Sequence, residues 1–159
     1  MPRTLNQKIG IIAEKAVRQH CKCPKCKKRS ARLKPLPNNF KCVDVVCDFC
    51  GYLAQVKGTR TNTHREITLV RAGGWKVLKE RLDAGIYFPV FIVKVQGETP
   101  TGIYYVPADF LRREVFVGHG KPRVIKAEQP AGKPRKYSMF NYDFRKLGPH
   151  RMIEIWKRK

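Results

Sequence analysis

The sequence predicts an α+β fold in which a mixed sheet is flanked by two main helices. Apolar residues recur at helical spacing in residues 5–20 and 71–83, and β-branched or aromatic runs separate and follow these segments. The run IYFPVFIVKV, residues 86–95, is almost entirely apolar, as expected of a central strand buried on both faces. A length of 159 residues suits one compact domain over residues 1–159 rather than two.

The N-terminal part should open with an amphipathic helix over residues 5–20, for which Thr4 is a suitable N-cap. Its apolar stripe is Ile9, Ile12, Ala13, Ala16 and Val17. The basic, proline-marked stretch 27–39 is interpreted as a loop or a twisted edge strand. Residues 40–46 alternate without Gly or Pro, which predicts a strand, and residues 52–57 are its expected antiparallel partner.

The middle of the chain should hold the second helix, around residues 71–83. Its apolar stripe is Trp75, Leu78 and Leu82. Core packing is the expected role of Trp75, and stacking on a base is the alternative. Gly85 suits the C′ position after this helix. Pro89 is expected at a bulge in the following strand, residues 86–95, because proline cannot donate to a strand ladder.

The C-terminal third is predicted to be mainly strands. The expected elements are a strand over 102–106, a short helix over 107–113, a long loop over 118–136, and strands over 137–144 and 151–156. The aromatic residues Tyr137, Phe140 and Tyr142 alternate beside basic residues. Core packing is their expected role, and stacking on DNA bases is the alternative.

The charge of the chain indicates a polyanionic partner. Lys and Arg number 34 against 12 Asp and Glu, a formal net charge of +22. Each neutralised phosphate releases a counterion and favours binding, so nucleic acid is the leading partner and an acidic membrane surface the minor alternative. No run approaches the roughly 18 apolar residues of a membrane span, and no signal peptide opens the sequence. We therefore expect a cytoplasmic protein with no membrane-spanning segment, whose partner is double-stranded DNA and not a membrane.

Four of the six cysteines form two C-x2-C pairs, with residues 27–46 between them. The paired residues are Cys23, Cys26, Cys47 and Cys50. This spacing suits one tetrahedral zinc ion held by two knuckles, which predicts a structural zinc ribbon over about residues 21–51. Cys21 and His20 are weaker candidate ligands, and Cys42 is expected to be a small core residue.

The predicted hairpin also carries polar residues that a zinc knuckle does not need. Asp44 precedes the second knuckle, and Gln55 and Lys57 follow it on one face of the returning strand. Asp44, Gln55 and the Val56 backbone carbonyl offer oxygen ligands for Mg²⁺ or Mn²⁺, and Lys57 can orient or deprotonate a water molecule. Glu14 can add a carboxylate through water. The alternative is a solvated strand face without catalytic function.

The arrangement D-(x)n-Q-x-K on a hairpin resembles the PD-(D/E)xK nucleases, and its Q-V-K version is similar to the Mrr-like branch. More specifically, Glu14 nine residues before C-P-K-C, then D-V-V-C-D-F-C, a four-residue gap and Q-V-K resemble the catalytic domain of DpnI and the Dam-replacing restriction endonucleases. Residues 12–57 carry the most specific likeness, and YYVPADFL extends it. Val43 replaces the motif's Pro, and Gln55 replaces the Glu found closest to DpnI.

The resemblance implies a PD-(D/E)xK-type mixed sheet with a four-cysteine zinc ribbon inserted at the catalytic hairpin, and cleavage of double-stranded DNA by a type II or modification-dependent restriction endonuclease. Asp44, Gln55 and Lys57 would form its catalytic core with support from Glu14. With Gln55, metal affinity is expected to be weaker or to shift toward Mn²⁺. The likeness does not include the winged-helix domain of DpnI, so recognition of N6-methyladenine in GATC does not carry over.

Basic residues in loops are expected to contact DNA phosphates. They are Arg60, His64, Arg65, Lys121, Arg123, Lys133, Arg135 and Lys136. The rival function is a non-catalytic zinc-ribbon protein that binds DNA or RNA on a nuclease scaffold, and a ribosome-associated basic zinc protein is a third possibility. The sequence does not choose between monomer and dimer, and it gives no target site.

Overall fold

The structure of the chain is a computed structural model. It describes residues 4–27, 32–37, 40, 42–60, 66–118, 123–125, 135–137, 139–147 and 151–158. The helices are α1 (Leu5–His20) and α2 (Trp75–Asp83), with short 3₁₀ turns η1 (Ala108–Phe110), η2 (Arg113–Val115) and η3 (Phe144–Leu147). The strands are β1 (Leu33–Pro35), β2 (Val45–Cys47), β3 (Leu53–Arg60), β4 (Leu69–Gly74), β5 (Val90–Gln96), β6 (Thr99–Val106), β7 (Phe116–Gly118), β8 (Arg123–Ile125), β9 (Arg135–Tyr137), β10 (Met139–Asp143) and β11 (Ile153–Lys157).

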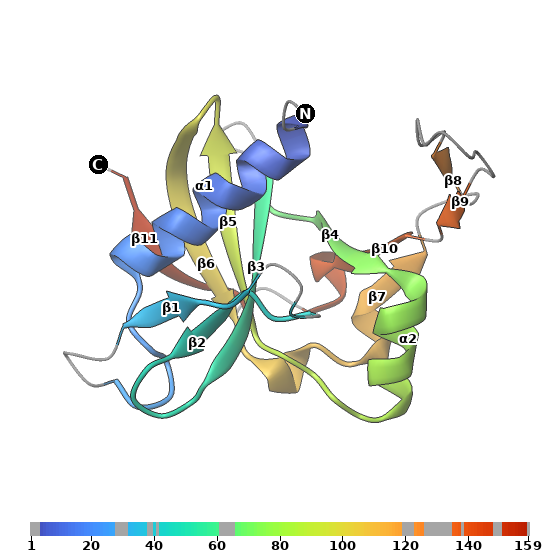
Figure 1. Cartoon of the computed structure of the whole chain (residues 1–159), viewed down its shortest axis with the longest axis horizontal. Helices are drawn as coiled ribbons and strands as arrows, with labels where there is room; N and C mark the ends of the chain where they lie inside the picture. The colour runs from blue at the N-terminus through green and yellow to red at the C-terminus, as the bar shows by residue number, and fades with distance from the viewer. Residues whose placement is uncertain are drawn as a thin grey trace.

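The main sheet has six strands in the order β1-β2-β3-β5-β6-β11 (Figure 1). Strands β3 and β5 are parallel, and the other neighbouring pairs are antiparallel. The predicted α+β fold with a mixed sheet is therefore confirmed. As expected, the apolar run 86–95 supplies a strand buried within the sheet, β5, although it begins only at Val90.

Helix α1 lies across the main sheet and is bounded as predicted. Thr4 and Gln7 form a capping box at its start, which supplies partners for backbone N–H groups that the first turn leaves unpaired. Ile9, Ala13 and Val17 are buried against the sheet. Gly58 on β3 permits this close approach, because a Cβ there would lie 2.5 Å from Ile9 Cγ2 and 2.9 Å from the Ile9 carbonyl oxygen.

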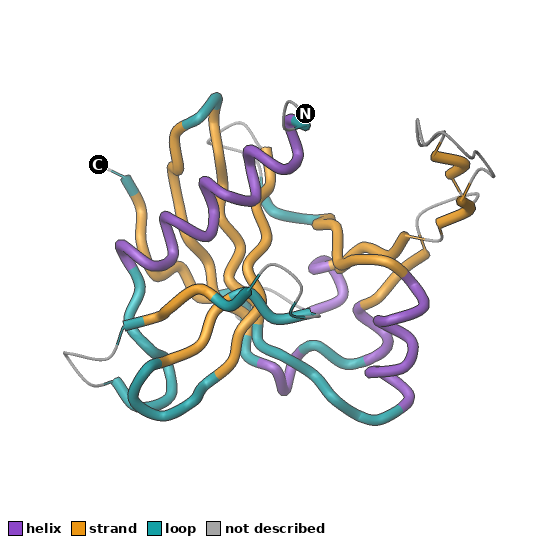
Figure 2. Tube along the Cα trace, in the orientation of Figure 1, coloured by secondary structure: helices purple, strands orange, loops and turns teal. Residues whose placement is uncertain are grey.

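A second, smaller sheet has the order β4-β10-β7, and Figure 2 shows it beside the main sheet. Helix α2 follows β4 directly and contacts it. The prediction that two main helices flank the main sheet was therefore wrong for α2, which accompanies the smaller sheet on the side away from α1 (Figure 1). Leu78 is partly buried and Leu82 is buried, as expected of an apolar stripe. The Trp75 side chain lies outside the described part.

The two sheets share an apolar cluster. Alternate residues of β5 point to opposite faces, so Phe91 and Val93 pack with α1, whereas Val90 and Ile92 pack with residues of the smaller sheet. Tyr142 of β10 belongs to this second cluster. Burial on both faces explains why the β5 sequence is continuously apolar instead of alternating.

The strand predicted over 40–46 was wrong in its first half. Cys42 has φ +65°, a left-handed conformation that ends any strand ladder, so β2 begins only at Val45. The edge-strand alternative for 27–39 is confirmed by β1, which pairs with β2. The predicted partner strand over 52–57 is β3, and it continues to Arg60 because β5 pairs with its outer half.

Several later predictions also need correction. Pro89 precedes β5 and accepts a hydrogen bond from Gln55 N–H, so it does not form a bulge. The short helix predicted over 107–113 is present as the 3₁₀ helix η1, with Pro107 at its N-cap, and it ends at Phe110 instead of residue 113. Segment 118–136 is not entirely loop, because β8 pairs with β9 there. The strand predicted over 137–144 is β10, and the final strand is β11.

The end of α2 matches the sequence prediction. Gly85 has φ +68°, its N–H donates to the Leu82 carbonyl, and Ile86 N–H donates to the Arg81 carbonyl. This pair of hydrogen bonds is a Schellman motif, which satisfies the last carbonyls of the helix. No helix within the described residues is long and apolar enough to cross a membrane.

Candidate functional site

Four cysteine sulfurs form a compact cluster at the turn end of the β2–β3 hairpin. The Sγ atoms of Cys23, Cys26, Cys47 and Cys50 all lie within 4.8 Å of one another. The Cys23–Cys50 and Cys26–Cys47 sulfurs are 3.6 Å and 3.8 Å apart, and all four thiols are free. Four zinc–sulfur bonds of about 2.3 Å in a tetrahedron place the sulfurs about 3.8 Å apart. The cluster therefore fits the predicted zinc ion.

Local turns hold the four thiols in place. Lys27 and Gly51 adopt positive φ after the two pairs, and Gly51 N–H donates to the Cys47 carbonyl. Burial opposes ionisation of Cys47, but N–H groups of Cys50 and Phe49 and the neighbouring sulfurs lower its pKa to about 7. Burial raises the pKa of the neighbouring Cys23 thiol to about 12, so zinc binding must release protons from the cluster.

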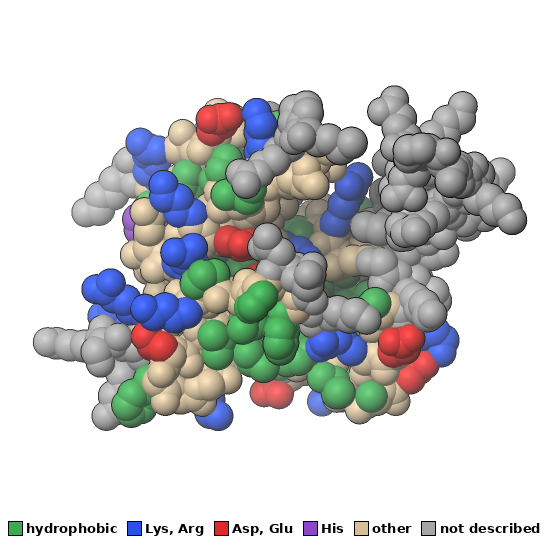
Figure 3. All heavy atoms as spheres, viewed as in Figure 1, with side chains coloured by type: hydrophobic (Ala, Val, Ile, Leu, Met, Phe, Trp, Pro, Cys, Tyr) green, Lys and Arg blue, Asp and Glu red, His purple; other side chains and the backbone are tan. Residues whose placement is uncertain are grey.

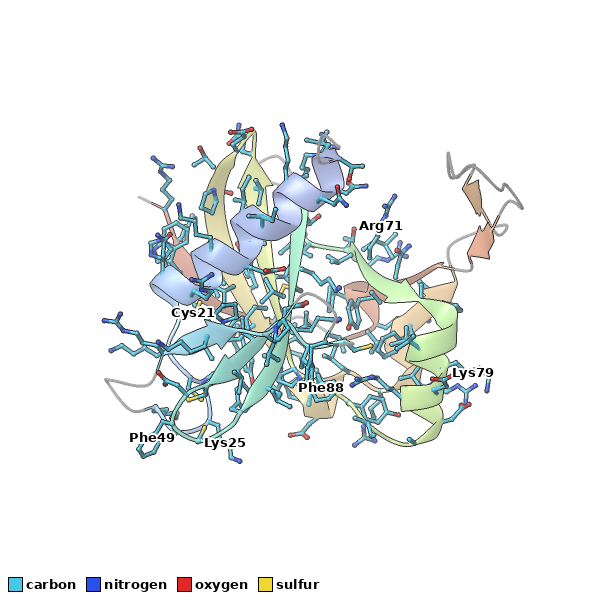
Figure 4. The ribbon with its side chains drawn as sticks, viewed as in Figure 1. Cys21, Lys25, Phe49, Arg71, Lys79 and Phe88 are labelled. Atoms are coloured by element: carbon cyan, nitrogen blue, oxygen red, sulfur yellow. The ribbon has the colours of Figure 1, made fainter. Side chains whose placement is uncertain are left out.

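The two weaker candidate ligands do not join the cluster. Cys21 is the buried C-cap residue of α1, where its N–H donates to the Val17 carbonyl, and burial raises the pKa of its thiol to about 12. His20 stacks on Trp156 with ring centroids 4.3 Å apart. Figure 4 shows Cys21 at the end of α1, whereas Lys25 and Phe49 point outward at the tip of the ribbon.

Asp44 lies one residue before β2 and connects the two arms of the hairpin. Its Oδ2 accepts a hydrogen bond from Val56 N–H at 2.7 Å, and its own N–H donates to the Ala54 carbonyl at 3.0 Å. The N–H and C=O groups of one strand residue point toward the same neighbour. The Val56 carbonyl therefore faces the side on which Asp44 lies, as a joint metal site requires.

Glu14 reaches the same region from α1. Glu14 and Asp44 line one small pocket of about 80 Å³, together with Leu36, Pro37, Phe40 and Val43. Burial raises the pKa of the Glu14 carboxyl, and the nearby Asp44 carboxylate raises it further, while Lys57 and Arg18 lower it. Two carboxylates that repel each other across a shared pocket are a favourable environment for a divalent cation.

Lys57 lies on the opposite face of β3 from Val56 and Gly58 and is only partly exposed. Burial lowers the pKa of its ammonium group, whereas negative charge on Asp44, Cys42 and Glu14 would raise it. The amine therefore lies close enough to both carboxylates to sense their charge. Burial makes this amine easier to deprotonate than an exposed lysine, and the carboxylates oppose that effect.

Gln55 is buried, with 7% of its surface exposed. Its backbone N–H donates to the Pro89 carbonyl, and its side-chain Oε1 accepts a hydrogen bond from the Tyr142 hydroxyl at 2.6 Å. A carbonyl oxygen has two lone pairs, so Oε1 keeps acceptor capacity for a metal ion. Because Gln55 is buried, it is not part of a solvated strand face, which was the alternative interpretation.

The sequence reasoning missed two residues of this region. It treated Tyr142 as a core residue, and the structure adds a hydrogen bond to Gln55 that no local pattern signals. It placed Cys42 in the core, whereas Cys42 is partly exposed and lies near Lys57 and Tyr142. Within the described part of the chain, only the four-cysteine cluster brings three or more His, Cys, Asp or Glu ligands together. The Glu14–Asp44 pocket offers two carboxylates, and Gln55 is not among the described residues that line it.

The predicted DNA contacts are only partly within the described residues. Arg60 is exposed at the end of β3, three residues beyond Lys57. Arg123, Arg135 and Lys136 belong to the β8–β9 pair, and their side chains are not described. His64, Arg65, Lys121 and Lys133 lie outside the described residues.

No protein-family model matches the chain, and no curated protein matches its sequence.

Proposed function

We propose that the protein is a metal-dependent DNA endonuclease of the PD-(D/E)xK type, related in its catalytic hairpin to the DpnI-like restriction enzymes. The observation that carries this proposal is the shared pocket of Glu14 and Asp44, with Lys57 close to both carboxylates. The combination of acidic ligands with a partly desolvated amine suits hydrolysis of a phosphodiester better than simple binding, which needs no such grouping.

In this proposal Asp44, Gln55 and the Val56 carbonyl hold Mg²⁺ or Mn²⁺, with Glu14 as a further ligand through water. When bound, the ion polarises the phosphodiester and lowers the pKa of a water ligand. Lys57 accepts a proton from the attacking water when its amine is neutral, or neutralises charge on the phosphate when it is protonated. Burial favours the neutral amine, and the nearby carboxylates favour the protonated amine.

The net charge of +22 supports a polyanionic substrate. In Figure 3 acidic atoms lie near the middle of the face shown, and basic side chains lie to their left. Lys15 and Arg18 are exposed on α1, the helix that carries Glu14, and Lys34 is exposed on β1. Cations around an acidic centre can hold a DNA backbone while the carboxylates bind a metal ion.

The zinc ribbon has a structural role in this account. Asp44 lies three residues before Cys47, and Gln55 five residues after Cys50, so a zinc ion at the cysteines would fix the hairpin that joins them. The hydrogen bond from Val56 N–H to Asp44 also connects the two arms of the hairpin, beyond the last paired residues of β2 and β3. Loss of zinc should therefore disturb the second metal site without removing any of its ligands.

The proposed function is tested by digestion of methylated and unmethylated plasmid with Mg²⁺ and with Mn²⁺, followed by sequencing of the ends. We expect linear or nicked products that require one of these ions and are stronger with Mn²⁺. Absence of any cleavage on both substrates with both ions would refute the proposal. A difference between the two plasmids would establish a dependence on methylation.

The second candidate function is non-catalytic nucleic-acid binding through the ribbon. It is favoured by Phe49 and Lys25, which both point outward from the ribbon (Figure 4). The Phe49 side chain is 63% exposed, and Lys25 is exposed as well. An aromatic ring beside a cation suits stacking on a base and contact with a phosphate. This function predicts salt-sensitive binding that Phe49→Ala weakens, and no cleavage with either ion.

A further inference from the structure

The hydrogen bond between Tyr142 and Gln55 joins two sheets at the candidate metal site. The two residues are 87 positions apart, Gln55 on β3 of the main sheet and Tyr142 on β10 of the smaller one. Both side chains are buried, at 7% and 4% exposure, and the Tyr142 hydroxyl lies 2.6 Å from Gln55 Oε1. A short bond between buried groups is strengthened by the absence of competing water.

The Tyr142 ring is fixed by its neighbours. Phe116 packs against it with ring centroids 4.9 Å apart, and the Phe144 ring stacks with it at a centroid distance of 5.5 Å. Strand β10 is itself the central strand of the smaller sheet, paired with both β4 and β7. The hydroxyl therefore approaches Gln55 from a rigid support, which is what a positioning group requires.

The chemistry of Gln55 makes such a group useful. A carboxylate offers a metal ion an oxygen in either orientation, but an amide has one oxygen and one NH₂ group that cannot bind a cation. Burial, with smaller effects from Cys42 and Asp44, raises the pKa of the Tyr142 phenol, so it remains a hydrogen-bond donor. In the structure this hydroxyl donates to Oε1, so the amide oxygen and not the NH₂ group faces Tyr142.

We propose that Tyr142 is a positioning residue that selects the amide orientation of Gln55 in which Oε1 is available as a metal ligand. Tyr142 thereby makes a neutral glutamine usable where an acid is usual, and it links the smaller sheet to the metal site. This inference rests on the proposed function, since it assumes that Gln55 binds the catalytic ion. Its test measures metal binding directly and does not depend on cleavage.

The experiment titrates zinc-loaded full-length protein with Mn²⁺ and follows free Mn²⁺ by electron paramagnetic resonance. We expect Tyr142→Phe to lower Mn²⁺ affinity about fivefold, the effect of about one hydrogen bond. In the Gln55→Glu background the same substitution should change affinity by less than about twofold, because either carboxylate oxygen can bind. Tyr104→Phe is the matched control, since it removes a hydroxyl that bonds Glu154 on the surface, and it should leave affinity unchanged.

Equal Mn²⁺ affinity of Tyr142→Phe and the parent overturns the inference, as does an equal loss in the parent and Gln55→Glu backgrounds. Phe116→Leu retains the hydroxyl but loosens its support, and should give a smaller loss; it replaces Tyr142→Phe if that variant unfolds. A parent that binds Mn²⁺ in this Tyr142-dependent way but cuts no DNA refutes the proposed function and leaves the inference standing. A parent that binds no Mn²⁺ refutes both.

Discussion

Replacing Gly58 with alanine tests the packing that brings Glu14 to the catalytic strand. A Cβ at position 58 would lie 2.5 Å from Ile9 Cγ2, 2.9 Å from the Ile9 carbonyl oxygen and 3.2 Å from Ala13 Cβ. The first two distances are shorter than real Cβ contacts, and one involves backbone, so rotation of a side chain cannot relieve both. Helix α1 must therefore move away from β3.

We expect Gly58→Ala to lower the free energy of unfolding by about 2 kcal/mol, the middle of the range for overpacking a close contact. For a domain of this size such a loss lowers Tm by roughly 4–8 °C. Glu14 is on the helix that moves, so Mn²⁺ affinity should fall as well. Thermal unfolding followed by circular dichroism measures the first effect, and Mn²⁺ titration below Tm measures the second.

Gly10→Ala is the matched control. Gly10 is in α1, and a Cβ there would meet nothing within 4 Å. Alanine in a helix is favoured over glycine by about 1 kcal/mol, so this variant should be more stable than the parent and should bind Mn²⁺ equally well. Stability of Gly58→Ala equal to that of the parent would refute the inferred contact between α1 and β3.

Three further predictions concern the carboxylate pocket, the cysteine cluster and the tip of the ribbon. The pKa of Glu14 is higher in the folded protein than in the unfolded chain, so ionisation of this carboxyl opposes folding. The free energy of unfolding therefore falls as pH rises through the raised pKa. Glu14→Gln should therefore raise Tm at about pH 8 and lose this advantage near about pH 4; an equal gain at both pH values contradicts the pKa direction. Cys47→Ser should release zinc, measured with a chromogenic chelator, and lower Tm, whereas Cys21→Ser should retain zinc; zinc loss in Cys21→Ser would show that the ligand set is wrong. If DNA contacts the ribbon tip, Lys25→Ala should reduce the slope of log affinity against log salt by about 1, and an unchanged slope places the DNA elsewhere.

Local patterns in the sequence were sufficient for several parts of the fold. Helix α1 has both an apolar period and a capping residue, two independent signals for one element, and its bounds were correct. The cysteine pairs constrain one another through the geometry of a single ion, so their spacing alone predicted the cluster. The convergence of Asp44 and Lys57 followed from the hairpin in the same way, because strand alternation is local.

The errors arose where distant contacts decide the structure. The left-handed backbone at Cys42 leaves no trace in composition, because its surroundings and not its residue type impose it. Helix α2 has an apolar stripe, but such a stripe predicts only that one face of the helix is buried and not which sheet it contacts. The contact between Tyr142 and Gln55 depends on how two sheets meet, which no spacing along the chain encodes.

The most direct measurement is the rate of double-stranded DNA cleavage by zinc-loaded parent, Lys57→Ala and Lys79→Ala proteins at saturating Mn²⁺. Lys79 is the matched control, because it is an exposed lysine on α2 that pairs with Asp83. Lys57→Ala should lose at least about 100-fold in rate with unchanged zinc content, since a positioned acid–base group contributes about 10²–10⁴-fold. Lys79→Ala should cut like the parent. Cleavage by Lys57→Ala at the parent rate would contradict the catalytic assignment.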